Sequence, residues 1–129
     1  MASISSFQSS FIIDLSPEEF VQLPNPPRLI DVRSSFEYAM FHAPNAINLS
    51  LQRILMGMFP GLRNWVLPQW FQDLPKNEPI AVICLTAHRS PVAAKQIAKA
   101  GFSKIFNITG GMMEWRRLGL TTCTGKQAA

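Results

Sequence analysis

The chain contains little cysteine: Cys84 and Cys123 are the two cysteines among its 129 residues. Two thiols so unevenly placed do not form the disulfide framework of a small secreted domain, and no CxxC pair or Cys/His cluster has the spacing of a zinc site. Residues 1–10 are rich in serine but lack the charged start and continuous apolar stretch of a secretory signal. We therefore expect a reducing, cytoplasmic location, with no metal and no cofactor.

Long apolar runs and clustered charge are also missing. No stretch approaches the ~20 apolar residues that a membrane-spanning helix requires, so no membrane partner is expected. The net charge is +4, and the basic residues are scattered rather than grouped with aromatic residues, which disfavours nucleic-acid binding. Small anions fit this modest positive charge better. Without repeats or a linker, a chain of this length should form one domain with its own core.

Short apolar segments alternate with segments of helical period, a pattern typical of βαβ units and a parallel sheet. We expect strands near 11–13, 28–32, 46–49, 79–84 and 104–108, and helices near 16–24, 35–40, 50–58, 91–100 and 112–117. The segment 79–84 is the most apolar, which predicts a strand at the sheet centre that is buried on both faces. The expected organisation is a flexible leader at 1–10, an α/β domain at 11–120 and a flexible tail at 121–129.

One stretch, residues 57–75, has no regular pattern. It contains four of the larger aromatic residues, Phe59, Trp65, Trp70 and Phe71, between three prolines. An irregular aromatic stretch usually covers a core, and otherwise forms an interaction surface or the wall of a substrate entrance. The sequence leaves these alternatives open.

Cys84 ends the most apolar strand, and a helical pattern begins shortly after it, at Pro91. A thiolate at a helix N-terminus is favoured by the helix dipole and by amide groups that have no partner within the helix. Arg89 adds a permanent positive charge nearby. The alternative is a small buried hydrophobic residue that closes a strand. Because Arg, Ser and Pro suit a loop and a helix start better than a core, the sequence favours a cysteine nucleophile above an anion-binding loop.

Several motifs follow one another in the order found in a known family. They are Leu29-Ile30-Asp31-Val32-Arg33, Glu37-Tyr38, His42-Ala43-Pro44-Asn45-Ala46-Ile47, Cys84 with Arg89-Ser90, Gly101-Phe102, and Gly110-Gly111 with Trp115. On these motifs, which cover about residues 11–120, the chain resembles a single-domain rhodanese, a sulfurtransferase. The resemblance implies a rhodanese-like α/β fold, in which a central five-stranded parallel sheet is flanked by helices on both faces.

The resemblance also implies a site and a reaction. Cys84 would carry a persulfide, surrounded by a loop of Leu85, Thr86, Ala87, His88, Arg89 and Ser90, with Arg33 as a candidate pocket residue. The Cys84 thiolate would accept sulfane sulfur from a donor such as thiosulfate and pass it to cyanide or a thiol, in two half-reactions. The implied partners are small sulfur-containing anions, with a protein thiol as a further candidate acceptor.

Two other functions stay open. A non-catalytic or sulfur-relay module would use the aromatic stretch from Phe59 to Phe71 to bind a protein. A phosphatase is disfavoured, because four residues separate Cys84 from Arg89, one fewer than in the C-x5-R loop of related phosphatases. An arginine alone would nevertheless suit a phosphate.

The chain departs from the family pattern at three positions where many members have glycine: Phe41, Asn45 and Ala87. Ala87 limits the backbone freedom of the loop. Asparagine tolerates the left-handed region, so Asn45 is a mild change. Nothing in the sequence explains Phe41.

Four further side chains have competing roles. Asp31 and Arg33 fit a buried ion pair better than a donor site, although Arg33 is the better site candidate of the two. His88 either presents its side chain to solvent or tunes the thiol. Cys123 is given no catalytic role, but exposure would make it oxidisable.

Overall fold

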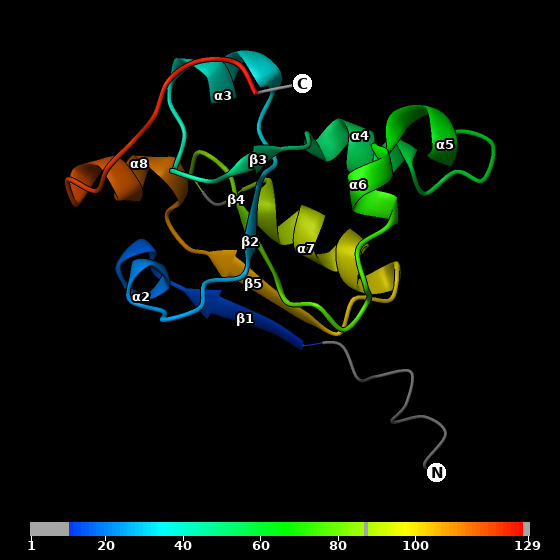
Figure 1. Ribbon diagram of the computed structural model, residues 1–129, viewed down its shortest axis with the longest axis horizontal. Coiled ribbons are helices and arrows are strands. Elements are labelled where there is room, and N and C mark those ends of the chain that lie inside the picture. The colour runs from blue at the N-terminus through cyan, green and yellow to red at the C-terminus, as the bar shows by residue number, and fades with distance from the viewer. Residues whose placement is uncertain (1–10, 87, 128–129) are drawn as a thin grey trace, which may run out of the picture.

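The computed structural model describes residues 11–86 and 88–127 (Figure 1). Residues 1–10, predicted to be a flexible leader, lie outside the described residues, as do Ala87 and the end of the chain at 128–129. Within the described residues, five strands form one parallel sheet in the order β1-β5-β4-β2-β3. Their bounds are β1 Phe11–Leu15, β2 Arg28–Asp31, β3 Ile47–Asn48, β4 Ile80–Ile83 and β5 Lys104–Ile108.

The prediction for the central strand is confirmed. β4 lies between β5 and β2, and all four of its residues are buried. Its side chains alternate between two cores: Ile80 and Val82 face one, and Ala81 and Ile83 face the other. A strand covered on both faces needs apolar residues at every position, which explains why this segment shows no alternation of apolar and polar residues.

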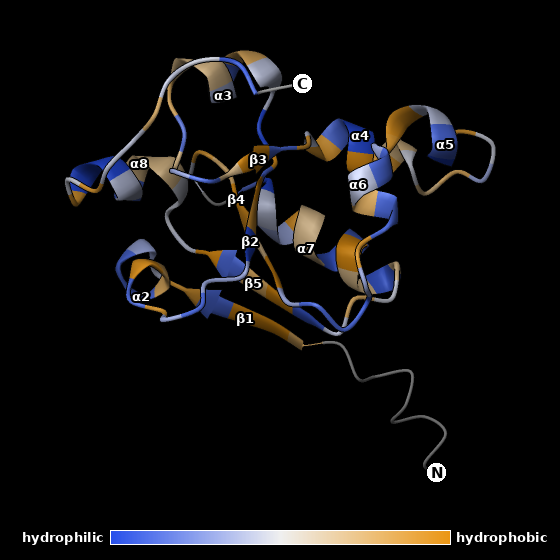
Figure 2. Ribbon diagram, in the orientation of Figure 1, coloured by the Kyte–Doolittle hydropathy of each residue, from blue (hydrophilic) through white to orange (hydrophobic). Residues whose placement is uncertain are grey.

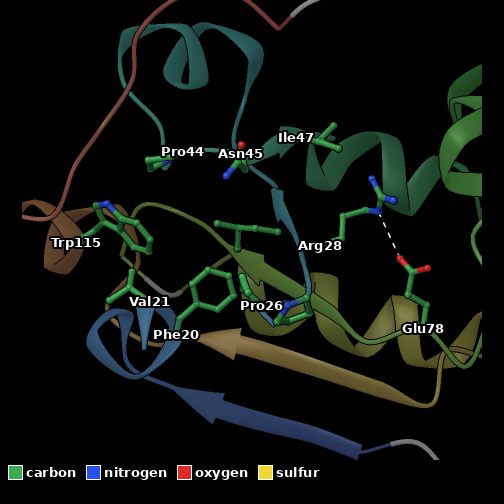
Figure 3. A pocket seen from close by; sticks show the side chains of 11 residues that line it. Phe20, Val21, Pro26, Arg28, Pro44, Asn45, Ile47, Glu78 and Trp115 are labelled. Carbon is green, nitrogen blue, oxygen red and sulfur yellow. Dashed lines mark ion pairs between the residues drawn. The ribbon is translucent and has the colours of Figure 1, made fainter. Parts of the chain in front are cut away.

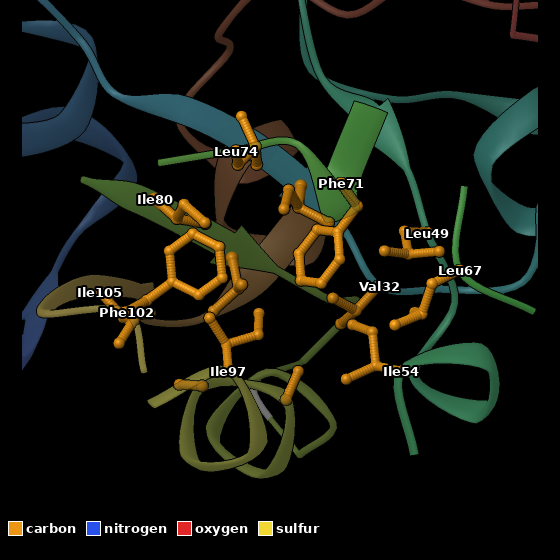
Figure 4. Close-up of a cluster of buried hydrophobic side chains, with 14 of the residues drawn as sticks. Val32, Leu49, Ile54, Leu67, Phe71, Leu74, Ile80, Ile97, Phe102 and Ile105 are labelled. Atoms are coloured by element: carbon orange, nitrogen blue, oxygen red, sulfur yellow. The ribbon is translucent and has the colours of Figure 1, made fainter. Parts of the chain in front are cut away.

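Helices cover both faces of the sheet. Their bounds are α2 Pro17–Val21, α3 Ser35–Met40, α4 Leu51–Met56, α5 Arg63–Val66, α6 Gln69–Gln72, α7 Ser90–Lys99 and α8 Gly111–Arg117. Residues of α4, α6 and α7 pack on one face, where Ile54, Phe71 and Ile97 converge (Figure 4). Residues of α2, α3 and α8 pack on the other face. Figure 2 shows apolar residues along the sheet and hydrophilic residues on α4 and α8.

Three helices start at serines. Ser16, Ser34 and Ser50 are the N-caps of α2, α3 and α4, and each hydroxyl accepts a hydrogen bond from a backbone N–H in the first turn. At α2 and α3 a glutamate, Glu19 or Glu37, bonds back to the N–H of the cap. This reciprocal pair of hydrogen bonds is a capping box. None of the described helices is long and apolar enough to cross a membrane.

The aromatic stretch is partly buried and partly exposed. Leu67 and Phe71 are buried in the core, whereas Phe59 and Trp65 are 63% and 85% exposed. Two helices that were not predicted, α5 and α6, form within this stretch. Pro68 separates the two helices: it follows Leu67, the C-cap of α5, and is itself the N-cap of α6. A proline lacks the N–H that a continuing helix requires.

The segment predicted to be a flexible tail, 121–129, makes defined contacts with the domain in its described residues up to 127. The Trp115 indole donates a hydrogen bond to Thr121 O (2.8 Å), and His42 and Cys123 exchange two backbone hydrogen bonds (2.9 and 2.8 Å). Gly125 N–H also donates to Ala39 O (2.8 Å). A buried indole N–H needs a hydrogen-bond acceptor, and Thr121 O in the tail provides one for Trp115. The tail runs from α8 to α3 (Figure 1).

Candidate active site

Cys84 is the first residue after β4, at the carboxyl end of the central strand, and its side chain is 1% exposed. Its thiol donates a hydrogen bond to Ser90 Oγ (3.4 Å). Ser90 is fully buried and is the first residue of α7. The sulfur therefore lies at the N-terminus of a ten-residue helix, as the sequence predicts. This end of a helix carries the partial positive charge that favours an anion.

The first turn of α8 holds the start of the loop. Met112 N–H donates to Cys84 O (2.8 Å), and Met113 N–H donates to Leu85 O (3.0 Å). The close approach of α8 to the loop requires a glycine at position 111. Gly111 has a φ of +58°, and a Cβ added to it would lie 2.4 Å from Cys84 O. The sequence showed the Gly110-Gly111 pair only as a family motif, and did not indicate that it supports the carbonyl of the candidate nucleophile.

Two described side chains of the loop face solvent. The side chains of Thr86 and His88 are exposed, and Thr86 Oγ1 lies 2.8 Å from His88 Nδ1 in a hydrogen bond. Leu85 is half-buried. Ala87 lies outside the described residues, so the expected effect of alanine in place of glycine stays a prediction.

Arg89 is held by Glu37, a residue that was not expected at the site. Its Nη1 and Nη2 donate to the two carboxylate oxygens of Glu37 at 2.7 and 2.8 Å. The hydrogen bonds from Arg89 lower the pKa of Glu37 from 4.5 to about 2. Hydrogen bonding to Glu37 raises the pKa of Arg89, and the charges of Cys84 and Asp31 add to this effect. Arg89 and the sulfur are therefore close enough to interact electrostatically.

Glu37 could be identified in the sequence only as the third residue of the capping box of α3. Its pairing with Arg89 joins positions 52 residues apart. No local pattern indicates such a contact. The motif order, in which Glu37-Tyr38 precedes the loop, was the one available indication.

The Glu37–Arg89 pair predicts a specific acid sensitivity. Since the folded-state pKa of Glu37 is depressed from 4.5 to about 2, the pair stabilises the fold above pH 4.5 and loses this contribution as the pH falls towards 2. Both side chains are partly exposed, so added salt should shrink the effect. A Glu37→Gln variant keeps an oxygen for the cap but does not titrate.

We therefore expect the unfolding free energy of the wild type to fall more steeply than that of Glu37→Gln between pH 4.5 and 2. Urea unfolding followed by circular dichroism at several pH values measures both slopes. Equal slopes would show that the pair contributes nothing to this pH dependence.

Arg33, the candidate pocket residue, is 1% exposed. Its Nε and Nη2 donate to the Asp31 carboxylate (3.0 and 2.8 Å), and Nη2 also donates to Phe41 O. The Phe41 ring lies near two guanidinium groups, 5.0 Å from that of Arg33 and 4.5 Å from that of Arg116. These contacts favour the structural alternative for Arg33, and cation–π attraction gives a reason for a phenylalanine at position 41.

The other departures from the family pattern also have backbone explanations. Phe41 has a φ of −169°, which is extended backbone that any residue adopts, so glycine is not required there. Asn45 has a φ of +66°, which confirms that asparagine occupies the left-handed region in place of glycine. His42 also has a structural role, because a hydrogen bond joins its Nδ1 to Tyr38 O (2.7 Å).

Cys123 and a separate cavity do not belong to the loop. Cys123 is exposed on the tail beside His42, and in the described part of the chain it forms no disulfide. A cavity of about 560 Å³ lies among Phe20, Pro44 and Trp115, and no loop residue lines it (Figure 3). The position of this cavity therefore does not identify the candidate site. The site is identified by the Cys84 sulfur, the N-terminus of α7 and the Arg89–Glu37 pair.

Comparisons with known proteins identify the family of the chain. The family model described as Rhodanese-like domain matches residues 16–118. The chain is 29% identical over 114 residues to the putative sulfur carrier protein YrkF of Bacillus subtilis, covering 86% of this chain and 55% of the relative. It is 23% identical over 108 residues to the thiosulfate sulfurtransferase GlpE of Vibrio cholerae, covering 84% and 90%. The chain thus spans about half the length of YrkF but most of GlpE.

Solved structures show the same fold. A rhodanese-related protein from Thermoplasma volcanium superposes with a TM-score of 0.67 at 22% identity, covering 86% of this chain and 97% of that one. A protein from Saccharomyces cerevisiae gives a TM-score of 0.67 at 24% identity, covering 85% and 95%. With the family model matched over most of its length, the chain belongs to the rhodanese-like domain family.

Proposed function

We propose that this protein is a sulfurtransferase that moves sulfane sulfur from a donor such as thiosulfate to cyanide or a thiol, through a persulfide on Cys84. One observation carries the proposal: the Cys84 sulfur lies at the end of the central strand, against the first residue of α7. Support also comes from GlpE, which is named a thiosulfate sulfurtransferase, and YrkF, named a putative sulfur carrier.

In the first half-reaction, the Cys84 thiolate attacks the outer sulfur of thiosulfate. The S–S bond of the donor breaks, and its electron pair leaves with sulfite. Cys84 is left as a persulfide anion, to which the Ser90 hydroxyl can donate a hydrogen bond across the observed contact. A buried anion is costly unless fixed dipoles replace water, and the N-terminus of α7 supplies such dipoles.

In the second half-reaction, cyanide attacks the outer sulfur of the persulfide. The new C–S bond gives thiocyanate, and the Cys84 thiolate is restored with the electron pair of the broken S–S bond. A thiolate acceptor reacts in the same way and leaves as a persulfide. Because the enzyme carries the sulfur between two separate substrates, the kinetics should be ping-pong.

Initial rates of thiocyanate formation, measured while thiosulfate and cyanide are varied, test the proposal. We expect parallel double-reciprocal lines. Lines that intersect would show a ternary complex, and therefore no persulfide intermediate. The absence of thiocyanate together with the absence of a persulfide on Cys84 would contradict sulfurtransferase activity.

A sulfur-relay module is a second candidate, because Phe59 and Trp65 are 63% and 85% exposed and offer a surface to a protein partner. In a relay, Cys84 would be persulfidated by a donor but would not be discharged by cyanide or small thiols. Mass spectrometry of the protein before and after addition of an acceptor separates the two functions.

A further inference from the structure

The segment 56–65, which runs from the last residue of α4 into α5, exposes several large apolar side chains. Trp65 is 85% exposed, the highest value among the large apolar residues that the structure describes, and Phe59 is 63% exposed. Met56, Met58 and Leu62 are between 37% and 43% exposed. We call these five side chains the exposed patch. Apolar side chains concentrated in this way mark an interaction surface, whereas single exposed ones do not.

Consecutive turns connect four residues of the exposed patch. Phe59 N–H donates to Met56 O (3.1 Å), Leu62 N–H donates to Phe59 O (3.0 Å), and Trp65 N–H donates to Leu62 O (2.9 Å). In turns of this kind, side chains three residues apart lie on the same side, so the turns favour one common direction for the four side chains. The same hydrogen bonds satisfy backbone groups that are costly to remove from water without a partner.

The exposed patch is anchored to the core behind it. Gly57 packs against Leu67, which is buried, because a Cβ added to the glycine would lie 2.6 Å from the leucine side chain. Arg53 Nε donates to Val66 O (2.7 Å) and so joins α4 to α5. Figure 1 shows α5 and the loop before it at the outer edge of the molecule, beyond α4. The patch therefore projects from the domain in a shape that is already fixed, which lowers the entropy cost of binding.

The charge around the exposed patch has one sign. No aspartate or glutamate occurs in the sequence between Glu37 and Asp73, whereas Arg53 and Arg63 are exposed in this interval. Burial and the charge of Arg63 lower the pKa of Lys76, so the lysine lies close enough to Arg63 to interact with it. Positive charge therefore borders the patch, and this combination suits a partner that is apolar inside and anionic at its surface.

We infer that the exposed patch binds the surface of an anionic membrane, with Trp65 and Phe59 among the lipid headgroups and Arg63 beside the phosphates. Tryptophan is enriched at membrane–water interfaces, and basic residues next to apolar ones are attracted to anionic lipids. The sequence predicts no membrane partner because it lacks a spanning run, but a contact with the surface of a bilayer needs no such run. The inference is independent of the proposed function.

A bilayer fits the exposed patch better than a folded protein partner does. A protein needs a hollow whose shape matches the projecting side chains, together with acidic groups placed opposite the arginines. A bilayer admits apolar side chains without a preformed hollow, and its anionic headgroups surround them on every side. Turns with internally bonded backbone groups also suit the interface, where water is scarce.

Binding of the full chain to lipid vesicles tests the inference. Co-sedimentation should show binding to vesicles of phosphatidylcholine and phosphatidylglycerol that is about tenfold tighter, or more, than binding to phosphatidylcholine alone, and added salt should weaken it. Lipids with brominated acyl chains should quench the fluorescence of Trp65, and Trp65→Phe should lose this quenching. Quenching separates insertion of the indole from adsorption by charge alone.

Two phenylalanines of nearly equal exposure give a matched pair of variants. Phe59→Ala should weaken vesicle binding about tenfold, because the ring leaves water on binding. Phe11, on β1, is 64% exposed and does not belong to the patch, so Phe11→Ala should leave the affinity unchanged. Arg63→Gln should weaken binding to the anionic vesicles about fivefold. Thermal unfolding checks that each variant is folded.

Several results would overturn the inference. The wild type would fail to bind anionic vesicles, the Phe59→Ala and Phe11→Ala variants would bind them equally well, or bound protein would show no quenching of Trp65. Failure to bind vesicles would leave the exposed side chains to the protein partner of a sulfur relay. Persulfidation of Cys84 does not enter these measurements, so they decide the inference whether or not the protein transfers sulfur.

Discussion

Replacing Cys84 with serine is expected to reduce sulfur transfer to the uncatalysed background, a loss of at least about 10³-fold, or about 4 kcal/mol of transition-state stabilisation. A serine hydroxyl stays protonated near neutral pH and does not form a stable sulfur adduct. The fold should survive, because serine is no larger than cysteine and can keep the hydrogen bond to Ser90. Thiocyanate formation measures the loss, and circular dichroism checks the fold.

Cys123 provides the matched control. It is the other cysteine of the chain, and it is exposed on the tail, where its backbone rather than its thiol pairs with His42. Cys123→Ser should therefore retain full activity. An active Cys84→Ser protein, or an inactive Cys123→Ser protein, would show that Cys84 is not the residue that carries the sulfur.

Gly111→Ala is expected to destabilise the protein by about 3 kcal/mol or more, and to displace the loop at Cys84. The added Cβ would lie 2.4 Å from Cys84 O and 2.5 Å from Leu85 O, and these are backbone atoms that cannot rotate away. The left-handed φ of +58° adds its own strain for a residue with a side chain. Persulfidation of Cys84 should slow along with the loss of stability.

The appropriate comparison is Gly119→Ala. Gly119 has a similar φ of +73°, but an added Cβ would meet nothing within 4 Å. This variant carries the backbone strain without the collision, and should lose about 1 kcal/mol. Urea unfolding of both variants gives the difference. Equal losses would mean that the close approach of α8 to the loop contributes nothing.

The strands of the sheet could be predicted from the sequence because the pattern that specifies each strand lies within a few adjacent residues. The continuous apolar run at 79–84 identified the central strand, and the helix expected near 16–24 begins with the capping box of Ser16 and Glu19, which are three residues apart. Cys84 was placed at the strand end by the polar residues that follow it. In each case, a few adjacent residues contain the physical cause.

Contacts between distant segments could not be predicted in this way. The tail is held by Trp115 and His42, whose hydrogen-bonding needs do not identify their partners. Glu37 binds Arg89 across 52 positions, and Phe41 contacts two arginines from different elements. Such pairs depend on how the helices lie against the sheet, which the periodicity of a single segment does not determine.

These distant contacts change the chemical picture of the loop. From sequence, Arg89 was a free positive charge beside a thiolate, suited to small anions. In the fold, both terminal nitrogens of Arg89 pair with Glu37, and Cys84 lies at the N-terminus of α7, the end of the helix dipole that favours an anion.

The intact mass of the protein after treatment with a sulfane-sulfur donor is the decisive measurement. A persulfide on Cys84 predicts a gain of one sulfur atom, about 32 Da, that maps to Cys84, is removed by cyanide and is absent from Cys84→Ser. An unchanged mass with every donor, or an adduct on Cys123 alone, would contradict sulfur transfer through Cys84.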